Sequence, residues 1–513
     1  MTAPNGMPGG LTARIRPLLR DAVAAFAGTP EQARLEAMAR RLDEPLRVAI
    51  AGRLKAGKST LLNAFVGERL AATDAGECTR VVTWYANGLA DRAWAHPRWR
   101  APRQIRFRRV DGRTVLELGA LQADDLDRLV VEVPSSRLER LTLIDTPGIG
   151  SLSTDVSART EAAMRGHGGG DHADRDDPQD EAAPVADAVL YLMRHLHTTD
   201  VGFLEAFHQR QFAGVTPVNA IGVLSRADEV GAGRIDAIDI AERVAADYRR
   251  DPRVRGLVQT VLPVAGLLAE AAVGLRERDA AALSALARGG PVADALLLTA
   301  QRFAGADGAA DGIVAAAARR ELLASMGLSG VRLSVALLRA GVVHDAVGLA
   351  RELRRRSGLD ALRDTLLTRF AQRRDVLKAQ AALGAVERVL ARRQVPGAER
   401  LRAQVEAVLA GAHELTELRL LNDLRTGTVE LGGEELTAEA EALLGADGTD
   451  VRARLRLPPD APVTALRPAV ITAVRRWQRE AASPAAAADA RRAAAVLRRS
   501  GEALLAATPR PPA

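Results

Sequence analysis

The sequence contains one cysteine, three lysines and few aromatic residues, and these shortages exclude several classes of protein. Cys78 alone cannot form an intrachain disulfide, which favours a reducing cytoplasm over a secreted, disulfide-stabilised domain. Aromatic residues make up 3% of the chain, which favours helices over β-sandwiches. Because no window of 18 residues is free of charge and residues 1–10 lack a basic and an apolar region, we expect neither a spanning helix nor a signal peptide.

The length and the charge place the chain among globular proteins of ordinary surface character. With 513 residues, 47% of them apolar, we expect two or three domains with ample cores. The formal net charge of +7 is modest for this length and gives little support for nucleic-acid binding. It is compatible with docking on an anionic membrane.

Residues 46–65 contain the pattern around which the chain is organised. An apolar run predicts a buried strand over 46–51, a glycine-rich turn follows, and an apolar helix begins near Leu61. Strand, glycine-rich turn and helix predict a phosphate-binding loop, because backbone N–H groups and the positive end of the helix then face an anion. The predicted nucleotide-binding residues of the loop are Gly52, Lys55, Ala56, Gly57, Lys58, Ser59 and Thr60.

Lysine usage supports this prediction. The only lysines among 71 basic residues are Lys55, Lys58 and Lys378, and two of them lie in this loop. A compact ammonium fits among phosphates where a planar guanidinium does not. We expect Lys58 to reach the terminal phosphates and the Ser59 hydroxyl to hold Mg²⁺.

A second motif, Asp-Thr-Pro-Gly, follows an apolar strand predicted at 138–145. We expect Asp145 to hold Mg²⁺ through water and the Gly148 N–H to sense the γ-phosphate. Between the two motifs, Thr79 is a candidate to close over Mg²⁺, with Thr73 as its competitor. The predicted metal set is therefore Ser59, Thr79 and Asp145.

A third motif, Ser-Arg-Ala-Asp, follows the apolar run 221–224. The Asp228 carboxylate can accept both the ring N–H and the exocyclic amine of guanine, a pair of donors that adenine lacks, so the predicted nucleotide is GTP. Ser225 replaces part of the usual Asn hydrogen bonding, and Arg226 supplies charge and a stem to lie along the base. Ala265, after the last strand, is expected to touch the base through backbone atoms.

Alternating strands and helices from 46 to about 266 predict an α/β domain with a mainly parallel sheet and helices on both faces. The strands are expected at 46–51, 80–86, 104–110, 114–118, 138–145, 187–193, 217–225 and 257–264. Residues 166–181 are rich in Gly, His and Asp, which predicts a mobile surface loop. His167, Asp171 and His172 offer metal ligands there, but polar filler is the favoured interpretation. His195 and His197 are expected to be structural.

Apolar periodicity outside the α/β domain, in residues 1–45 and 267–513, predicts helices. Two amphipathic helices are expected within 1–45, a helical neck or connector over 267–348, and a trunk with terminal neck helices over 349–513. The trunk begins with two long helices, 349–395 and 398–425, that form an antiparallel hairpin around Pro396-Gly397. The last two helices lie near 464–482 and 484–507. Short β-prone runs occur only at 428–431 and 451–457.

Taken together, Gly-x4-Gly-Lys-Ser-Thr, Glu-Cys-Thr-Arg, Asp-Thr-Pro-Gly and Ser-Arg-Ala-Asp resemble the bacterial dynamin-like GTPases. The chain is most similar to the actinobacterial branch with the isoniazid-inducible dynamin-like proteins. The resemblance covers about 45–266 in motifs and the rest only in architecture. It implies a Mg²⁺-dependent P-loop GTPase domain inserted between helices of an elongated all-α neck and trunk. It further implies GTP hydrolysis, self-association through GTPase heads, and remodelling or fusion of membranes from the cytoplasmic face.

By position, the resemblance gives Lys58, Ser59, Thr79, Asp145, Gly148 and Asp228 the roles described above. The chain departs from the family in lacking the Asn and Lys of the guanine motif and in carrying Lys55 where dynamins have a small polar residue. Related large GTPases place a catalytic arginine at this position. Our hypothesis is that Lys55 supplies cationic charge near the transition state, with an ordinary exposed loop lysine as the alternative.

Three segments are candidates for membrane contact: 326–349, 392–397 and 475–479. For the first and the last, packing in the helical body is the favoured interpretation. The alternative functions are an RNA- or ribosome-associated GTPase and a nucleotide-gated scaffold with little turnover. Sparse aromatics and the helical C-terminal region argue against the former, and no nucleic acid is expected. A paralogous dynamin-like protein is a further partner that the family implies.

Overall fold

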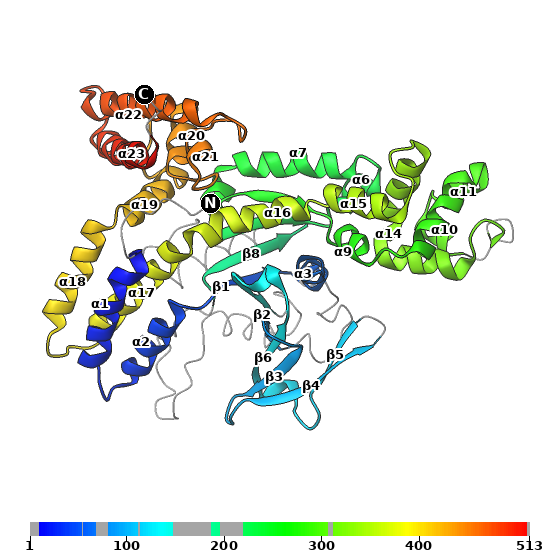
Figure 1. Ribbon diagram of the computed structural model, residues 1–513, viewed down its shortest axis with the longest axis horizontal. Helices are drawn as coiled ribbons and strands as arrows, with labels where there is room; N and C mark the ends of the chain where they lie inside the picture. Colours follow the sequence, from blue (N-terminus) through cyan, green and yellow to red (C-terminus); the bar gives the residue numbers. More distant parts are fainter. Residues whose placement is uncertain are drawn as a thin grey trace.

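The computed structural model describes residues 10–53, 55–67, 81–110, 113–146, 186–194, 219–305 and 311–509. At its centre lies a ten-stranded sheet in the order β10-β9-β8-β1-β7-β2-β6-β3-β4-β5 (Figure 1). The strands are β1 (Leu46–Gly52), β2 (Thr83–Asn87), β3 (Arg92–Pro97), β4 (Arg103–Val110), β5 (Arg113–Glu117), β6 (Leu126–Val133), β7 (Leu141–Asp145), β8 (Ala188–Met193), β9 (Ala220–Ser225) and β10 (Val261–Val264).

The sheet has a parallel half and a mostly antiparallel half. Strands β10, β9, β8, β1 and β7 are parallel, and β2 joins them antiparallel to β7. Strand β6 is parallel to β2, and β3, β4 and β5 complete the sheet as an antiparallel extension. The predicted mainly parallel α/β domain is confirmed. Each predicted strand overlaps an observed one, but β3 and β6 were not predicted, because charged residues interrupt their apolar patterns.

Both faces of the parallel half are covered by helices, as alternating side chains require. Val48 and Ile50 of β1 share a core with helix α3 (Lys58–Val66) and α16 (Leu359–Thr365). Ala49 and Ala51 face the opposite core, which includes residues of α7 (Ala237–Arg250), α9 (Gly266–Gly274), α10 (Glu277–Arg288) and α14 (Ala316–Arg339). Burial on both faces explains why the central strands are continuously apolar.

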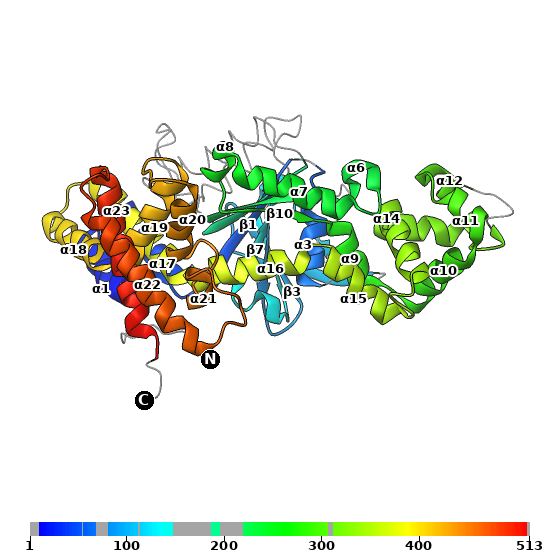
Figure 2. The ribbon, with the colours of Figure 1, turned by 90° about the horizontal axis from the view of Figure 1, so that it is seen from above.

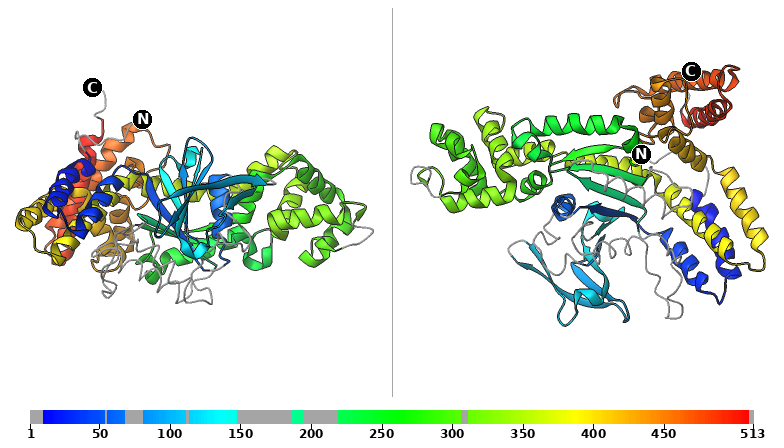
Figure 3. Two further views of the ribbon diagram at one scale, coloured as in Figure 1. Left: turned by 90° about the horizontal axis from the view of Figure 1, so that it is seen from below. Right: turned by 180° about the vertical axis from the view of Figure 1, so that it is seen from behind.

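Helices that precede and helices that follow the α/β domain form one bundle beside the sheet (Figures 1 and 3). Helices α1 (Leu11–Ala25) and α2 (Pro30–Arg41) share a core with α17 (Arg374–Arg392) and α18 (Ala398–Gly411). Ile15, Leu35, Val386 and Val405 belong to this core. The expected insertion of the α/β domain between helices of one helical body is therefore what the structure contains.

A separate C-terminal group of helices packs around the buried Trp477. It comprises α19 (His413–Arg425), α20 (Glu434–Leu443), α21 (Val451–Arg454), α22 (Val463–Ala482) and α23 (Ala488–Ala507). The β-prone runs at 428–431 and 451–457 contain no strand, and the second begins with the short helix α21. The burial of Trp477 agrees with the interpretation of 475–479 as a packing segment.

Residues 266–356 form a helical lobe at the end of the sheet opposite α1 and α2 (Figures 1 and 2). Besides α9, α10 and α14 it contains α11 (Gly290–Leu296), α12 (Ala300–Ala304) and α15 (Ala346–Arg356). The chain reaches the bundle only after residue 356, and the predicted neck or connector role of 267–348 stays a prediction. The structure leaves the other predicted domain boundaries as predictions.

The predicted continuous helix over 349–395 is interrupted at Ser357 and Gly358. Gly358 has a φ of +76°, and a Cβ there would lie 2.2 Å from the carbonyl oxygen of Pro263, so only glycine fits against the last strand. Beyond it, α16, a π-helical turn at Leu366–Phe370 and a 3₁₀ turn at Ala371–Arg373 lead into α17. The second predicted helix, 398–425, is likewise divided at Ala412.

Among the described residues one helix, α14, is long and apolar enough to cross a membrane by length and composition alone. This differs from the expectation of no such segment. Leu322, Met326 and Val331 of α14 are buried against the α/β domain, and the fully buried Arg319 donates to the carbonyl oxygen of Phe303 at 2.8 Å. Packing within the protein therefore accounts for its apolar character, and agrees with the favoured interpretation of 326–349.

Candidate functional site

The predicted phosphate-binding loop connects the carboxyl end of β1 to the first turn of α3. Gly52 has a φ of +147°, and a Cβ on it would lie 2.5 Å from the carbonyl oxygen of Leu192 on β8. Gly57, immediately before α3, also has a positive φ. These conformations turn the chain sharply, so the loop backbone and the N-terminus of α3 face the same space, as binding of an anion requires.

Lys58 folds over this loop. Its Nζ donates to the carbonyl oxygens of Gly52 at 3.2 Å and Arg53 at 3.3 Å. Burial lowers the pKa of the Lys58 ammonium, and the nearby Asp145 carboxylate opposes that shift. The amine is thus held at the mouth of the loop, where phosphate oxygens can replace the two carbonyl oxygens as acceptors.

Ser59 and Asp145 form the candidate magnesium site. The Ser59 hydroxyl donates to Asp145 Oδ2 at 3.3 Å across the gap between α3 and β7. The second carboxylate oxygen, Oδ1, is buried and has no hydrogen-bond partner among the residues that the structure describes. Burial raises the pKa of Asp145 to about 6, against the opposing effects of Lys58 and Ser59. A buried carboxylate with an unsatisfied oxygen beside a hydroxyl fits the oxygen ligands that Mg²⁺ prefers.

The neighbouring Thr146 was not singled out from the sequence. Its hydroxyl donates to the carbonyl oxygen of Ile50 at 2.8 Å and is buried. This bond ties the end of β7 to β1 and so holds Asp145 opposite Ser59. A threonine directly after the acidic residue is the only sequence signal for this role.

The predicted guanine-binding residues lie after β9. Asp228 is largely buried, and burial raises the pKa of its carboxyl group. Ser225 donates from Oγ to the carbonyl oxygen of Met193 at 3.2 Å, so its hydroxyl stabilises the β8–β9 pair. The Ser225 hydroxyl is therefore used in a contact within the protein. Of the two residues, Asp228 has the side chain that is better placed to bind a base.

Arg226 links this region to the phosphate loop, a contact that the sequence did not predict. It occupies the left-handed conformation with a φ of 54° and donates from Nη2 to the carbonyl oxygen of Lys55 at 2.9 Å. Its other terminal nitrogen pairs with Glu229 at 2.8 Å, and Glu229 also pairs with Arg194. Lys55 itself has a φ of 62°. Arg226 therefore connects the two segments that the sequence predicts to bind the nucleotide.

Three other residues that the sequence predicts to contact the nucleotide make contacts within the protein instead. Ala56 is buried, and its N–H donates to the carbonyl oxygen of Arg53 at 3.1 Å. Thr60 faces α9, since a Cβ at Gly266 would lie 3.6 Å from its methyl carbon. Ala265 donates its N–H to Ser357 at 2.9 Å, and its carbonyl oxygen accepts from Ala269 at 3.0 Å. Both backbone groups of Ala265 are thus engaged, which does not support its predicted contact with the base.

Several predicted residues lie outside the described part of the chain. They are Thr73, Cys78, Thr79, Gly148, His195, His197 and the segment 166–181 with His167, Asp171 and His172. Among the described residues no group of three or more His, Cys, Asp or Glu side chains is arranged to hold a metal ion. The roles predicted for Thr79 and Gly148 stay predictions.

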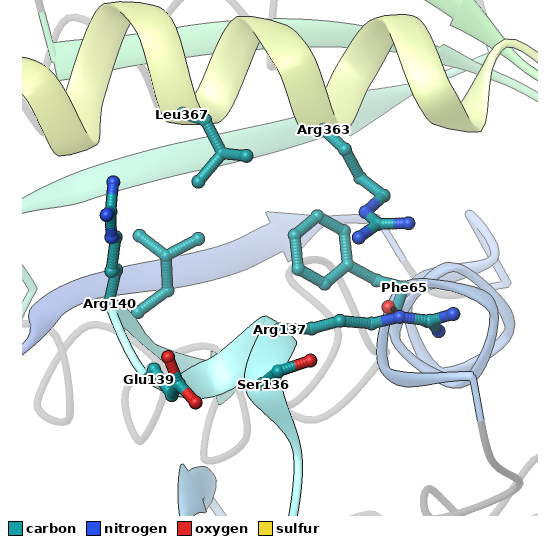
Figure 4. A pocket seen from close by; sticks show the side chains of 8 residues that line it. Phe65, Ser136, Arg137, Glu139, Arg140, Arg363 and Leu367 are labelled. Carbon is teal, nitrogen blue, oxygen red and sulfur yellow. Dashed lines mark hydrogen bonds between the residues drawn. The ribbon is translucent and has the colours of Figure 1, made fainter. Parts of the chain in front are cut away.

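A cavity of about 190 Å³ lies at the C-terminal end of α3, away from the phosphate loop (Figure 4). Figure 4 shows Arg363 of α16 directed toward the ring of Phe65, and Arg137, from the turn before β7, directed toward the end of α3. Arg137 donates to the carbonyl oxygen of Phe65 at 3.3 Å, at the end of the helix. This cavity is explained by helix capping and does not belong to the nucleotide site.

Comparison with known proteins agrees with this geometry. Residues 47–209 match a family described as "50S ribosome-binding GTPase". The isoniazid-induced protein IniC of Mycobacterium tuberculosis, from two strains, is 38% identical over 501 residues, which cover 96% of this chain and 98% of IniC. The chain belongs to the bacterial dynamin-like GTPases. The bacterial dynamin-like protein of Nostoc punctiforme is 26% identical over 214 residues, 40% of this chain and 28% of that protein.

Two solved structures also align with this dynamin-like chain. Both belong to an oligomerised bacterial dynamin pair described as sensing and tethering membranes. They are 13% and 12% identical, with TM-scores of 0.31 and 0.32, and each alignment covers 97% of this chain and 74% of the other. The match to the GTPase family covers only the nucleotide-binding part, so its name does not extend to the helical regions of the dynamin-like chain.

Proposed function

We propose that this dynamin-like chain binds and hydrolyses GTP at the loop Gly52–Thr60 and uses the reaction to drive self-assembly and remodelling or fusion of membranes. The observation that carries the nucleotide part is the meeting of Ser59, Asp145 and Lys58 at the carboxyl ends of β1 and β7. When bound, Mg²⁺ supplies charge neutralisation at the phosphates. Ser59 and Asp145 would hold it, with Thr79 as the third proposed ligand.

Charge placement carries the chemistry in this proposal. Lys58 stabilises negative charge on the terminal phosphates, and the α3 N-terminus supplies backbone donors that are already oriented. The Gly148 N–H is proposed to sense the γ-phosphate. Lys55 is proposed to add cationic charge near the transition state, and Arg226 supports it by holding its carbonyl oxygen at 2.9 Å.

Guanine preference rests on Asp228. Among the described residues, Arg226 pairs with Glu229 rather than with the buried Asp228 carboxylate, so a ligand that offers two donors would stabilise that carboxylate. Guanine provides them through its ring N–H and exocyclic amine. Arg226 faces the phosphate loop through Lys55, so we propose that it positions that loop as well as lying near the base.

The membrane part is supported by similarity to dynamin-like proteins and by the bundle in which helices from before and after the α/β domain pack together. We propose peripheral attachment to an anionic membrane on the cytoplasmic side, association through GTPase heads, and a paralogous dynamin-like protein as a further partner. A rearrangement near Asp145 would move the head relative to α17 and the N-terminal helices.

Nucleotide hydrolysis measured against protein concentration tests this proposal, with GTP and ATP compared and with or without vesicles of phosphatidylglycerol. We expect turnover of GTP only, a turnover per molecule that rises with concentration, and a further rise on the vesicles. Concentration-independent turnover that vesicles leave unchanged would contradict the dynamin-type mechanism. Binding of GTP without turnover would favour a nucleotide-gated scaffold.

A further inference from the structure

The turn between β3 and β4 exposes a tryptophan among several arginines. We infer that this turn is a contact surface for an anionic lipid membrane, an inference that rests on the proposed membrane function and adds a site to it. The surface, here the β3–β4 tip, consists of Arg98, Trp99, Arg100, Arg103 and Arg106. It lies on the GTPase domain itself, apart from all three segments that the sequence suggested.

Trp99 is the first observation behind this inference. Its side chain is 67% exposed, whereas Trp477 is buried and Trp84 and Trp94 are partly buried. In a chain with 3% aromatic residues, an indole so exposed contributes little to the core. Indole rings favour the boundary between water and lipid, where one edge meets apolar carbon and the N–H stays hydrated.

The arginines provide the second observation. Arg98, Arg100, Arg103 and Arg106 are all exposed, and residues 98–110 contain no Asp or Glu. Among the described residues, Arg98, Arg100 and Arg106 form no ion pair with a carboxylate. The Arg98 N–H donates to the carbonyl oxygen of Asp125 at 3.0 Å, so Asp124 and Asp125 adjoin one side of the tip. Glu117, which lies opposite Arg106 in the sheet register, pairs with Arg108. Positive charge at the tip is thus available to an external anion.

The position of the tip distinguishes a membrane from other anionic partners. Strands β3, β4 and β5 form the antiparallel margin of the sheet, away from the bundle and from the helical lobe (Figures 1 and 3). Neither of the two cavities of about 190 and 550 Å³ includes a residue of the tip. A turn with one apical aromatic ring suits an extended anionic plane, whereas single-stranded nucleic acid requires a groove with several stacking positions.

The tip can touch lipid without blocking the nucleotide site. The phosphate loop lies between β1 and α3 in the parallel half of the sheet, while the tip belongs to the antiparallel extension. Contact at the tip would place the GTPase domain directly on the membrane.

The test is co-sedimentation of the full chain with vesicles of phosphatidylglycerol and of phosphatidylcholine, with GDP or GTP and at two salt concentrations. The variant R98Q/R100Q/R103Q is compared with R392Q/R393Q/R475Q, which removes the same charge from the other basic surfaces. Each basic residue near an anionic surface contributes about a fivefold change in binding, so we expect the tip variant to bind phosphatidylglycerol roughly 100-fold more weakly. The control should stay within threefold of the wild type.

Two further variants separate charge from structure. R98K/R100K/R103K keeps the charge and should bind nearly as the wild type does, and Trp99→Ala should weaken binding roughly tenfold. Thermal melting of every variant verifies that these exposed substitutions leave the fold intact. Equal loss in the tip variant and the control, or no loss in the tip variant, would overturn the inference while leaving the proposed membrane function in place.

Failure of the broader proposal gives a different result. If the wild type binds no phosphatidylglycerol vesicles in either nucleotide state, the membrane part of the proposed function fails together with the tip. If the wild type instead binds a duplex oligonucleotide more tightly than the vesicles, and the tip variant loses that binding, the tip is a nucleic-acid surface and the lipid assignment is overturned.

Discussion

At the scale of single residues, burial of Asp145 disfavours its ionised carboxylate, the form that is proposed to hold Mg²⁺. Its folded pKa of about 6 lies above the ordinary value of 3.8, so the nucleotide-free protein binds an extra proton between these values. A raised carboxyl pKa means that stability is lost as pH rises through this window. At neutral pH the ionised Asp145 carboxylate therefore destabilises the folded protein through its desolvation, and a bound cation would offset that cost.

Asp145→Asn should consequently raise the stability of the nucleotide-free protein at pH 7 by about 2–3 kcal/mol relative to the wild type. The advantage should disappear near pH 4, where the wild-type carboxyl group is protonated. Thermal melting across pH, without nucleotide or Mg²⁺, measures this difference. Parallel profiles for the two proteins would contradict the role of burial, and Mg²⁺ should stabilise only the wild type.

The proposed role of Asp228 in recognising guanine leads to a prediction for Asp228→Asn. Asp228→Asn replaces an acceptor by a donor beside the exocyclic group, so GTP binding should weaken by roughly 100-fold. Xanthosine triphosphate carries a carbonyl at that position and should bind the variant better than GTP. Fluorescence titration with both nucleotides checks this, and the exposed Asp236→Asn is the matched control. Unchanged GTP affinity in Asp228→Asn would remove Asp228 from the base site.

Substitution of Lys55 tests whether this loop lysine takes part in GTP hydrolysis. Lys55→Ala should lower GTP turnover by roughly 10–100-fold and change nucleotide affinity by less than threefold, because charge near the transition state acts on the chemical step. Single-turnover kinetics together with binding titrations separate the two quantities. Equal losses in turnover and affinity would identify Lys55 as a binding residue only.

At the scale of elements, a buried ion cluster joins α2, β8 and α17. Asp187 accepts from Arg41 at 2.6 Å and from the Arg47 N–H at 2.9 Å, and Lys378 lies 3.9 Å away and donates to the Arg41 carbonyl oxygen. Burial opposes ionisation of Asp187, but Arg41 and Lys378 outweigh it and lower its pKa. Burial lowers the pKa of Lys378 to about 8.

Among the described residues, Asp187 is the carboxylate that contacts both buried cations, Arg41 and Lys378. Asp187→Asn should therefore destabilise the protein by about 3–5 kcal/mol, because unpaired charges remain buried. Lys378→Met should cost less than about 1 kcal/mol, since Arg41 still pairs with Asp187 and the desolvation of Lys378, which Asp187 offsets only in part, is removed. Urea unfolding followed by helical signal compares the two. Equal costs would mean that Asp187 is not the organising charge of the cluster.

At the scale of the whole molecule, the C-terminal helices contact the GTPase domain through polar groups around a cavity of about 550 Å³. Arg425 donates to the carbonyl oxygens of Val258 at 3.3 Å and Gln259 at 2.8 Å, Arg255 pairs with Glu441, and Arg369 pairs with Asp447 at 3.1 Å. Because ion pairs and hydrogen bonds to carbonyl oxygens make up these contacts, we expect this interface to separate at a lower cost than a purely apolar one.

Arg425→Ala should weaken this contact by about 1–3 kcal/mol, because two buried carbonyl oxygens lose their donor. We expect faster limited proteolysis between α19 and α20 and a larger radius of gyration in solution scattering, with GTP affinity unchanged. Arg253→Ala, on the exposed face of α8 (Pro252–Arg255), is the control. Identical proteolysis of both variants would show that other contacts hold the C-terminal helices.

Local patterns in the sequence determined the parallel core, the strand, turn and helix around Gly52–Thr60, and the position of Asp145 and Asp228 at strand ends. A strand followed by a glycine-rich turn and a helix depends only on neighbouring residues, so spacing alone predicts it. The paired helices at the N-terminus and the hairpin around Pro396-Gly397 followed from the same local periodicity.

Only the tertiary structure decided features that join distant residues. Gly358 ends a helix because its backbone meets Pro263, and Arg226 reaches Lys55 across 171 positions. The position of the 266–356 lobe, the pairing of Arg41 with Asp187, and strands β3 and β6 also depend on such contacts. These features are stabilised by packing and charge interactions between segments that lie far apart in the sequence. Periodicity and composition describe only neighbouring residues, so they do not predict such contacts.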